Sequence, residues 1–139
     1  MDSKTVSRPA EQKPVSQARS TVLRVFGEIP FHTEGATVAL AFGPDGCLWS
    51  VEEPGVLRQW DPANGSPLAW HALGGPENVW AFSEDAGTLA TASDDLSLWD
   101  VASGRQRVLL AQPSWVTAVA FPSSANHVAT GHEDGIVRL

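Results

Sequence analysis

Residues 79–100 read VWAFSEDAGTLATASDDLSLWD, in which one apolar run ends in Phe and a later one ends in Trp-Asp. The same order occurs one step earlier, in residues 39–61, which begin with ALAF and end with WD. A third copy of the opening segment, AVAF, occupies residues 118–121. A fixed step of about 40 residues predicts a stacked repeat. The step is measured between the aromatic anchors Phe42, Phe82 and Phe121.

The chain between and around these anchors is predicted to be all-β. Short apolar runs alternate with turn signals such as Gly43-Pro44-Asp45-Gly46 and Asn64-Gly65. No run has the 3.6-residue period of an amphipathic helix. The expected strands are residues 36–42, 47–51, 56–61, 68–73, 78–82, 88–92, 97–101, 106–110, 115–121, 127–130 and 136–139.

The faces of these strands indicate how the sheets are packed. Leu40 and Phe42 alternate with Ala39 and Ala41, so both faces of the strand are apolar, one large and one small. A sheet with one solvated face would carry polar residues at every second position. A large and a small apolar face are typical of a sheet held between two similar sheets, as in a β-propeller.

Composition narrows the class of protein. The chain has 139 residues, 42% of them hydrophobic, and a net charge of −7. Five basic and two acidic side chains fall in residues 1–24, against four basic and fourteen acidic in the remainder. An acidic body argues against nucleic-acid binding. No apolar stretch is long enough to span a membrane, and Cys47 is the only cysteine in the sequence, so a soluble cytoplasmic protein is expected.

The Trp-Asp pairs, together with Thr130-Gly131-His132-Glu133-Asp134-Gly135, resemble the WD40-repeat family. The resemblance implies a partial β-propeller of about three four-stranded blades, the last one incomplete. It also suggests the N-terminal part of a longer propeller protein, in which residues 21–30 give the outer strand that closes the ring. The expected organisation is a disordered polar leader at 1–20, a partial propeller at 21–139, and repeats at about 31–70, 71–110 and 111–139.

In that family a loop His, a turn Asp, a strand Ser or Thr and a strand Trp form a buried polar network in each blade. Here the turn position of the first copy holds Pro54, and Asp94 or Asp95 stands as a shifted substitute in the second. The incomplete match implies that packing, more than the polar network, holds these blades. The residues that carry the repeat signature are His32, Ser50, Trp60, Asp61, Thr91, Trp99, Asp100, Thr130 and Asp134.

No pattern in the sequence points to catalysis. His127 and the His132-Glu133-Asp134 turn could suggest a metal site, but the repeat frame gives Asp134 a turn role and the ligand spacing matches no known metal motif. His32 and Glu34 could suggest general acid–base chemistry, yet the frame assigns His32 to the blade. No cofactor and no metal are expected.

The predicted function is therefore a non-catalytic protein-interaction scaffold. The alternative is a regulatory or substrate-docking propeller segment of a larger enzyme whose catalytic domain lies outside this chain. Protein partners are expected, nucleic acid and membranes are not, and open blade edges could allow self-association. The predicted contact face is acidic, suits a basic partner, and consists of Glu34, Glu52, Glu53, Glu77, Asn78, Asp94, Asp95, Trp115 and Glu133.

Overall fold

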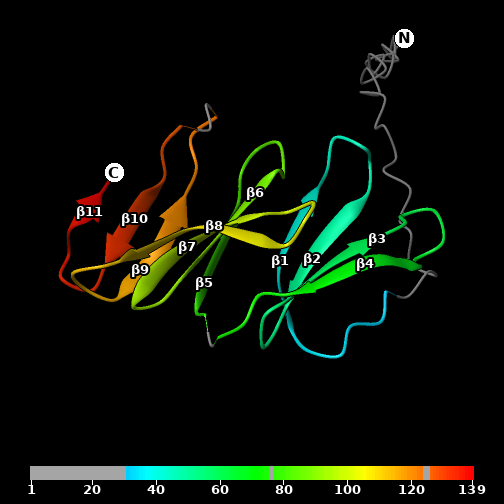
Figure 1. Cartoon of the computed structure of the whole chain (residues 1–139), viewed down its shortest axis with the longest axis horizontal. Helices are drawn as coiled ribbons and strands as arrows, with labels where there is room; N and C mark the ends of the chain where they lie inside the picture. Colours follow the sequence, from blue (N-terminus) through cyan, green and yellow to red (C-terminus); the bar gives the residue numbers. More distant parts are fainter. Residues whose placement is uncertain (1–30, 76, 124–125) are drawn as a thin grey trace, which may run out of the picture.

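The computed structural model describes residues 31–75, 77–123 and 126–139 (Figure 1). These residues form eleven strands and no helix. The strands are β1 (Thr37–Phe42), β2 (Leu48–Glu52), β3 (Val56–Trp60), β4 (Pro67–Ala72), β5 (Val79–Phe82), β6 (Thr88–Ala92), β7 (Asp95–Asp100), β8 (Arg105–Ala111), β9 (Val116–Ala120), β10 (Ala129–His132) and β11 (Val137–Arg138).

The strands make three separate antiparallel sheets. The first runs β1-β2-β3-β4, the second β5-β6-β7-β8, and the third β9-β10-β11. Each is a meander in which consecutive strands pair. The all-β prediction, with two full blades and an incomplete third, is confirmed. The predicted strand ends lie within about two residues of the observed ones throughout.

Two turns show why the sequence bends where it does. Gly46 and Gly135 both have φ of 79°, a left-handed conformation that glycine adopts without strain. Beside each of them an aspartate accepts a backbone N–H two residues ahead, Asp45 from Cys47 and Asp134 from Ile136, both at 3.0 Å. This side-chain bond substitutes for a turn hydrogen bond and fixes the hairpin.

The three sheets stack through two apolar layers. The first layer contains Val51 and Leu57 from the first sheet and Leu89 from the second, all fully buried, with Trp80 and Phe82 packed against it. Its alanine side is supplied by Ala39, as the alternation along β1 predicted.

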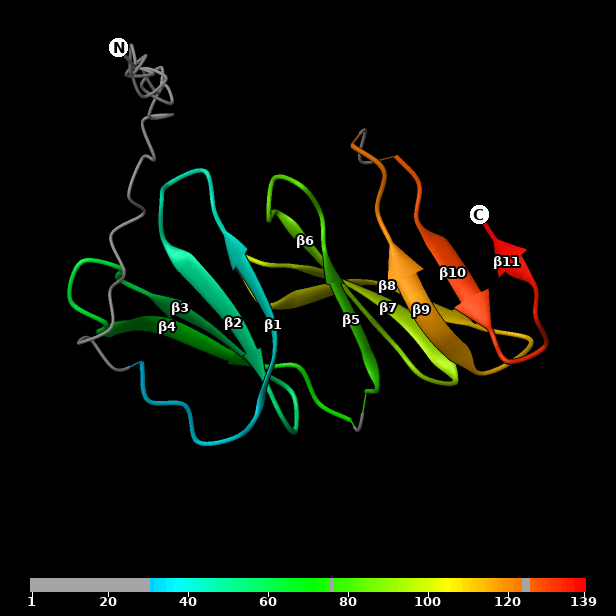
Figure 2. The same cartoon turned by 180° about the vertical axis from the view of Figure 1, so that it is seen from behind.

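The second layer joins the second and third sheets. Ala90 and Ala92 of the second sheet are fully buried, and Val119 and Phe121 of the third pack against them. Figure 2 shows the β5–β8 sheet between the other two. Large side chains of each later sheet thus pack over alanines of the sheet before it.

Two expectations fall outside the part of the chain that the structure describes, namely the polar leader at 1–20 and the ring-closing strand at 21–30. Within residues 31–75, 77–123 and 126–139, no helix has the length and apolarity needed to cross a membrane.

Candidate functional site

One edge of every sheet collects the segments that sequence reasoning assigned to a contact face. Even-numbered strands end there and odd-numbered strands begin there, and this edge lies toward the bottom of Figure 1. Backbone hydrogen bonds connect neighbouring segments along it: Glu53 N donates to Ala36 O at 2.9 Å, and Glu133 N donates to Trp115 O at 3.0 Å. These two bonds brace the edge within the first and the third sheet, and Val116 N, which donates to Ser93 O at 2.9 Å, links the second sheet to the third.

Gly35 allows the closest approach on this edge. A Cβ added there would lie 2.0 Å from the carbonyl oxygen of Glu53. No other residue type fits without moving the backbone of the β2–β3 turn. Gly35 thereby sets the position of Glu53 on the face.

Carboxylates dominate the exposed part of this edge. We call it the acidic rim, and it consists of Glu34, Glu53, Glu77, Asp94, Asp95 and Glu133. All of these are exposed except Glu77, which is half-buried. Asn78 is exposed beside them, and Trp115 keeps 37% of its surface accessible next to the first residue of β9.

One residue of the predicted face does not belong to it. Glu52 is only 1% exposed, and its carboxylate forms an ion pair with Arg58 at 3.0 Å. The reason is strand alternation: Glu52 is the last residue of β2 and points to the same side as Ser50, while Glu53 follows the strand and faces solvent.

A small hollow of about 160 Å³ opens on the rim between the first two sheets, lined by Glu53, Pro54, Glu77, Asn78 and Trp80. Burial raises the pKa of the Glu77 carboxyl, the nearby Asp95 charge adds to this, and a contact with Ser93 opposes it. Among the described residues, Glu77 Oε2 is buried without a hydrogen-bond partner. A carboxylate in this setting favours a cationic group from outside.

The raised pKa of Glu77 predicts a pH-dependent cost to stability. A carboxyl whose pKa is higher in the folded chain stabilises the fold while protonated, and that stability is lost as pH rises from the ordinary value of 4.5 through the folded pKa. Glu77→Gln should therefore raise the melting temperature near pH 7, relative to the unaltered chain, more than it does near pH 4. Thermal melts at both pH values test this. An identical difference at both would contradict it.

The strand Trp and Ser or Thr of the repeat signature are brought together as predicted in two blades. Trp60 Nε1 donates to Ser50 Oγ at 2.7 Å, and Trp99 Nε1 donates to Thr91 Oγ1 at 3.0 Å. All four side chains are buried. These bonds tie the second and third strands of each blade together.

The third member of the network differs from the expectation. His32 is exposed. Ser50 Oγ instead donates to Glu52 Oε1 at 3.0 Å, and Arg58 Nε and Nη2 donate to the same carboxylate at 3.0 and 3.3 Å. In the first blade the acceptor therefore comes from the same strand, two residues after the serine, and an arginine from the neighbouring strand completes it.

In the third blade the acceptor again lies two residues after the hydroxyl-bearing residue, on the same strand. Thr130 Oγ1 and His132 Nε2 are 2.9 Å apart, and His132 Nδ1 is 2.9 Å from the carbonyl oxygen of Ser114. A carbonyl only accepts, so Nδ1 carries the proton and Nε2 accepts from the threonine. Sequence reasoning missed both partners, although the spacing of two along a strand, which puts side chains on one face, was a usable signal.

Asp94 and Asp95 do not replace the missing turn carboxylate. Both are exposed at the β6–β7 turn, and within the described residues neither bonds to Thr91 or Trp99. The hairpin from Thr91 to Trp99 is two residues shorter than the hairpin from Ser50 to Trp60 in the first blade. With this shorter hairpin, both carboxylates lie at the exposed edge of the sheet and neither reaches the buried Thr91 and Trp99 side chains.

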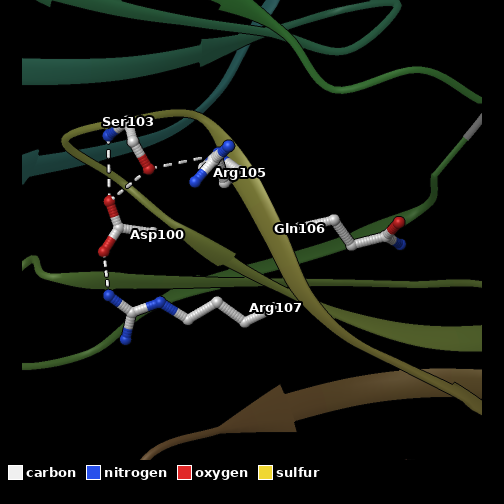
Figure 3. Close-up of a pocket in the computed structure, with 5 residues that line it drawn as sticks. All are labelled: Asp100, Ser103, Arg105, Gln106 and Arg107. Carbon is white, nitrogen blue, oxygen red and sulfur yellow. Dashed lines mark hydrogen bonds and ion pairs between the residues drawn. The ribbon is translucent and has the colours of Figure 1, made fainter.

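The aspartates of the two Trp-Asp pairs shape the hairpins that follow them. Asp100 Oδ1 accepts from Ser103 N at 2.9 Å and from Ser103 Oγ at 2.6 Å, while Arg107 pairs with its other oxygen (Figure 3). The bonds from Ser103 and the Arg107 charge lower the pKa of Asp100. Asp61 makes the matching bonds in the first blade, from Ala63 N at 2.8 Å and Asn64 Nδ2 at 3.1 Å. Both are turn-forming groups.

Asp134 has a similar local role. It accepts from Arg138 Nη2 at 2.6 Å across the β10–β11 hairpin, and that bond is the main cause of its lowered pKa. In the described ranges, no group of three His, Cys, Asp or Glu side chains is arranged to hold a metal ion. Both ring nitrogens of His132 are already engaged within the blade.

The three stacked antiparallel sheets, each pinned by a Ser/Thr-centred bond, define the chain as a set of β-propeller blades. Residues 104–139 match the family model for the WD domain, G-beta repeat. The resemblance of the chain to the WD40-repeat family is therefore confirmed, by a family model within residues 104–139 and by the fold of the three sheets.

Two known proteins show the extent of the likeness. The serine-threonine kinase receptor-associated protein of Gallus gallus is 34% identical over 71 residues, which cover 48% of this chain and 20% of that protein. The crystal structure of the RRP9 WD40 repeats superposes with a TM-score of 0.61 at 17% identity, over 76% of this chain and 35% of that one. The chain spans about a fifth of the length of the first and about a third of the second.

Proposed function

We propose that this chain is a non-catalytic scaffold that binds a basic segment of a partner protein on the acidic rim. WD40 repeats form a fold of the protein-interaction type. The observation that carries the more specific proposal is the concentration of exposed carboxylates on one braced edge of all three sheets. Complementary charge steers a basic partner to such a surface and fixes its register.

Two details support a specific contact beyond general attraction. The hollow beside Trp80 offers an aromatic wall and the Glu77 carboxylate together, a combination that suits a lysine or arginine side chain. Trp115 stands half-exposed on the same edge, where an aromatic side chain can anchor a partner. The related chicken protein is described as receptor-associated. The proposal places this scaffold in the cytoplasm.

A charge-reversal experiment tests the rim. Glu53→Lys combined with Asp95→Lys should weaken binding of a fluorescent Lys/Arg-rich peptide by about three- to tenfold, because both substitutions add repulsion at the contact. Melting should hardly change, since exposed substitutions usually shift stability by less than about 0.5 kcal/mol. Fluorescence anisotropy at low and high salt measures the binding.

The matched control changes the same charge elsewhere. Glu84 is exposed in the β5–β6 turn, at the opposite edge of the second sheet. Glu84→Lys combined with Asp85→Lys alters net charge equally and should leave peptide binding within about twofold of the unaltered chain. If both double variants weakened peptide binding equally, the effect would come from net charge alone, and the acidic rim would not be the binding site.

A further inference from the structure

The outer strand of the second sheet, β8, pairs with a neighbour on one side only among the described residues. This seven-residue strand is hydrogen-bonded to β7, and all of its residues except the half-buried Val108 are exposed. The neighbouring sheets pack against the two faces of the second sheet and leave its outer edge free (Figure 2). Further sheets stacked on either end would leave this edge as it is.

The register of β7 and β8 shows which backbone groups point toward the open side. Gln112 N donates to Asp94 O at 3.2 Å, so these two residues form a hydrogen-bonded pair. Hydrogen-bonded and non-bonded pairs alternate along an antiparallel ladder, and the register is regular from Gln112 back to Val108. The N–H and C=O groups of Leu109 and Ala111 therefore point away from β7.

One half of this edge carries a feature that hinders strand pairing, and the other half does not. Arg107 has no partner on β7 and forms a bulge near the start of the strand. From Val108 to Ala111 there is no proline and no charge, and Leu109 and Leu110 are 59% and 51% exposed. The equivalent strand of the first sheet, β4, begins with Pro67, which cannot donate a backbone hydrogen bond. An open edge of this kind can accept an added strand.

The start of β8 favours acidic side chains in such a strand. Arg105 and Arg107 are two of only four basic residues after residue 24, where fourteen residues are acidic. Arg107 pairs with Asp100, whereas Arg105 forms no ion pair within the described part of the chain. A hollow of about 590 Å³ lies here, lined by Asp100, Ser103, Arg105, Gln106 and Arg107 (Figure 3). A carboxylate that enters this hollow would meet the Arg105 guanidinium.

We propose that β8 binds an extended acidic segment of a partner protein, which joins the second sheet as a fifth, antiparallel strand. The backbone of Leu109 and Ala111 supplies its hydrogen bonds, and Arg105 holds carboxylates at the other end. Asp95 lies opposite Ala111 and repels carboxylates there, so the acidic residues come last in the added strand. Residues 1–24 carry five basic and two acidic side chains, which makes them a poorer match to this edge. The proposal does not depend on the function of the acidic rim.

A capped, fluorescent peptide of seven residues tests this strand addition. Its first and third residues are valine, its fifth and seventh are glutamate, and the others are threonine. Fluorescence anisotropy with the 139-residue chain should show saturable binding that weakens as salt is added. N-methylation of the first and third residues removes the donors that face Ala111 and Leu109, and should weaken binding by about tenfold or more. Methylation of the second and fourth residues, whose N–H groups point away from β8, should change binding by less than about threefold.

Variants of the chain test the two parts of the site separately. Leu109→Pro removes an outward N–H without breaking a bond to β7, so binding should weaken by about tenfold while melting hardly changes. Leu109→Ala keeps that N–H and should weaken binding by less than about threefold. Arg105→Glu should weaken binding by about three- to tenfold, and Arg138→Glu, the same charge change on β11, should leave it within about twofold. If Leu109→Pro fails to fold, the two methylated peptides with the unaltered chain decide.

Four results would overturn the proposal. The unmodified peptide could fail to bind, or both methylation patterns could weaken it equally. A peptide of reversed sequence, with its glutamates at the amino end, could bind as tightly as the original. The Arg105 and Arg138 variants could lose the same affinity. Each of the last three would mean that charge alone attracts the peptide and that no ordered strand forms on β8.

Discussion

Phe82→Ala should lower the free energy of unfolding by about 2–4 kcal/mol. Phe82 packs on the apolar layer that joins the first two sheets, beside the fully buried Leu57 and Leu89. Removing the ring deletes its transfer free energy and leaves a cavity that two rigid sheets cannot fully close. Urea unfolding followed by tryptophan fluorescence measures the change, since Trp49 and Trp99 lie in the same layer.

The chain contains its own control for this substitution. Phe42 occupies the equivalent repeat position in the first sheet but is 68% exposed. Phe42→Ala should cost less than about 1 kcal/mol, because little apolar surface is lost from the interior. Equal losses at Phe42 and Phe82 would mean that the second sheet does not lie on the first.

Much of the fold was predictable because its signals are local. Thr88–Ala92 was predicted with the ends that β6 has, since turn residues flank a short apolar run. The alternation of Ala39 and Ala41 with Leu40 and Phe42 predicted stacking on both faces of this strand. Ala39 does pack against the second sheet, whereas Leu40 and Phe42 are exposed in the described residues, where no sheet lies on their side. These inferences need only the two-residue period of a strand and the chemistry of its turns.

The candidate site was predicted less well, because it depends on register between strands. Glu52 and Glu53 look alike in sequence, yet one is buried and the other exposed. The burial of Glu52 requires Arg58 to lie opposite Ser50, and that pairing is set by the length of the β2–β3 hairpin. Applying strand alternation from Ser50 would have turned Glu52 inward. The expectation for His32 came from the family pattern, which this blade does not follow.

Glu52→Ala should lower the free energy of unfolding by about 2–4 kcal/mol, since removing one partner of a buried ion pair leaves the other uncompensated. Arg58 is only 17% exposed along its side chain, and Ser50 would lose its acceptor as well. Replacing the pair together, by Glu52→Leu with Arg58→Met, should recover most of the loss, because apolar residues of similar volume often substitute for a buried pair without cost. Chemical unfolding of the unaltered chain and of these two variants measures the loss and its recovery.

Variants of two other residues, His32 and Glu53, test whether Glu52 takes the place of the loop histidine that the family pattern predicts. If it has, His32→Ala and Glu53→Ala should each change stability by less than about 0.5 kcal/mol, since both side chains are exposed. In His32→Ala and Glu53→Ala, Arg58 would keep its position over the Trp60 ring, 5.4 Å from the centroid. A loss at His32 as large as that at Glu52 would return the histidine to the network. A larger loss at Glu52 than at His32 would show that Ser50 and Glu52, on one strand, form the polar network of the first blade. It would also show that this network forms without a carboxylate at the turn position of Pro54.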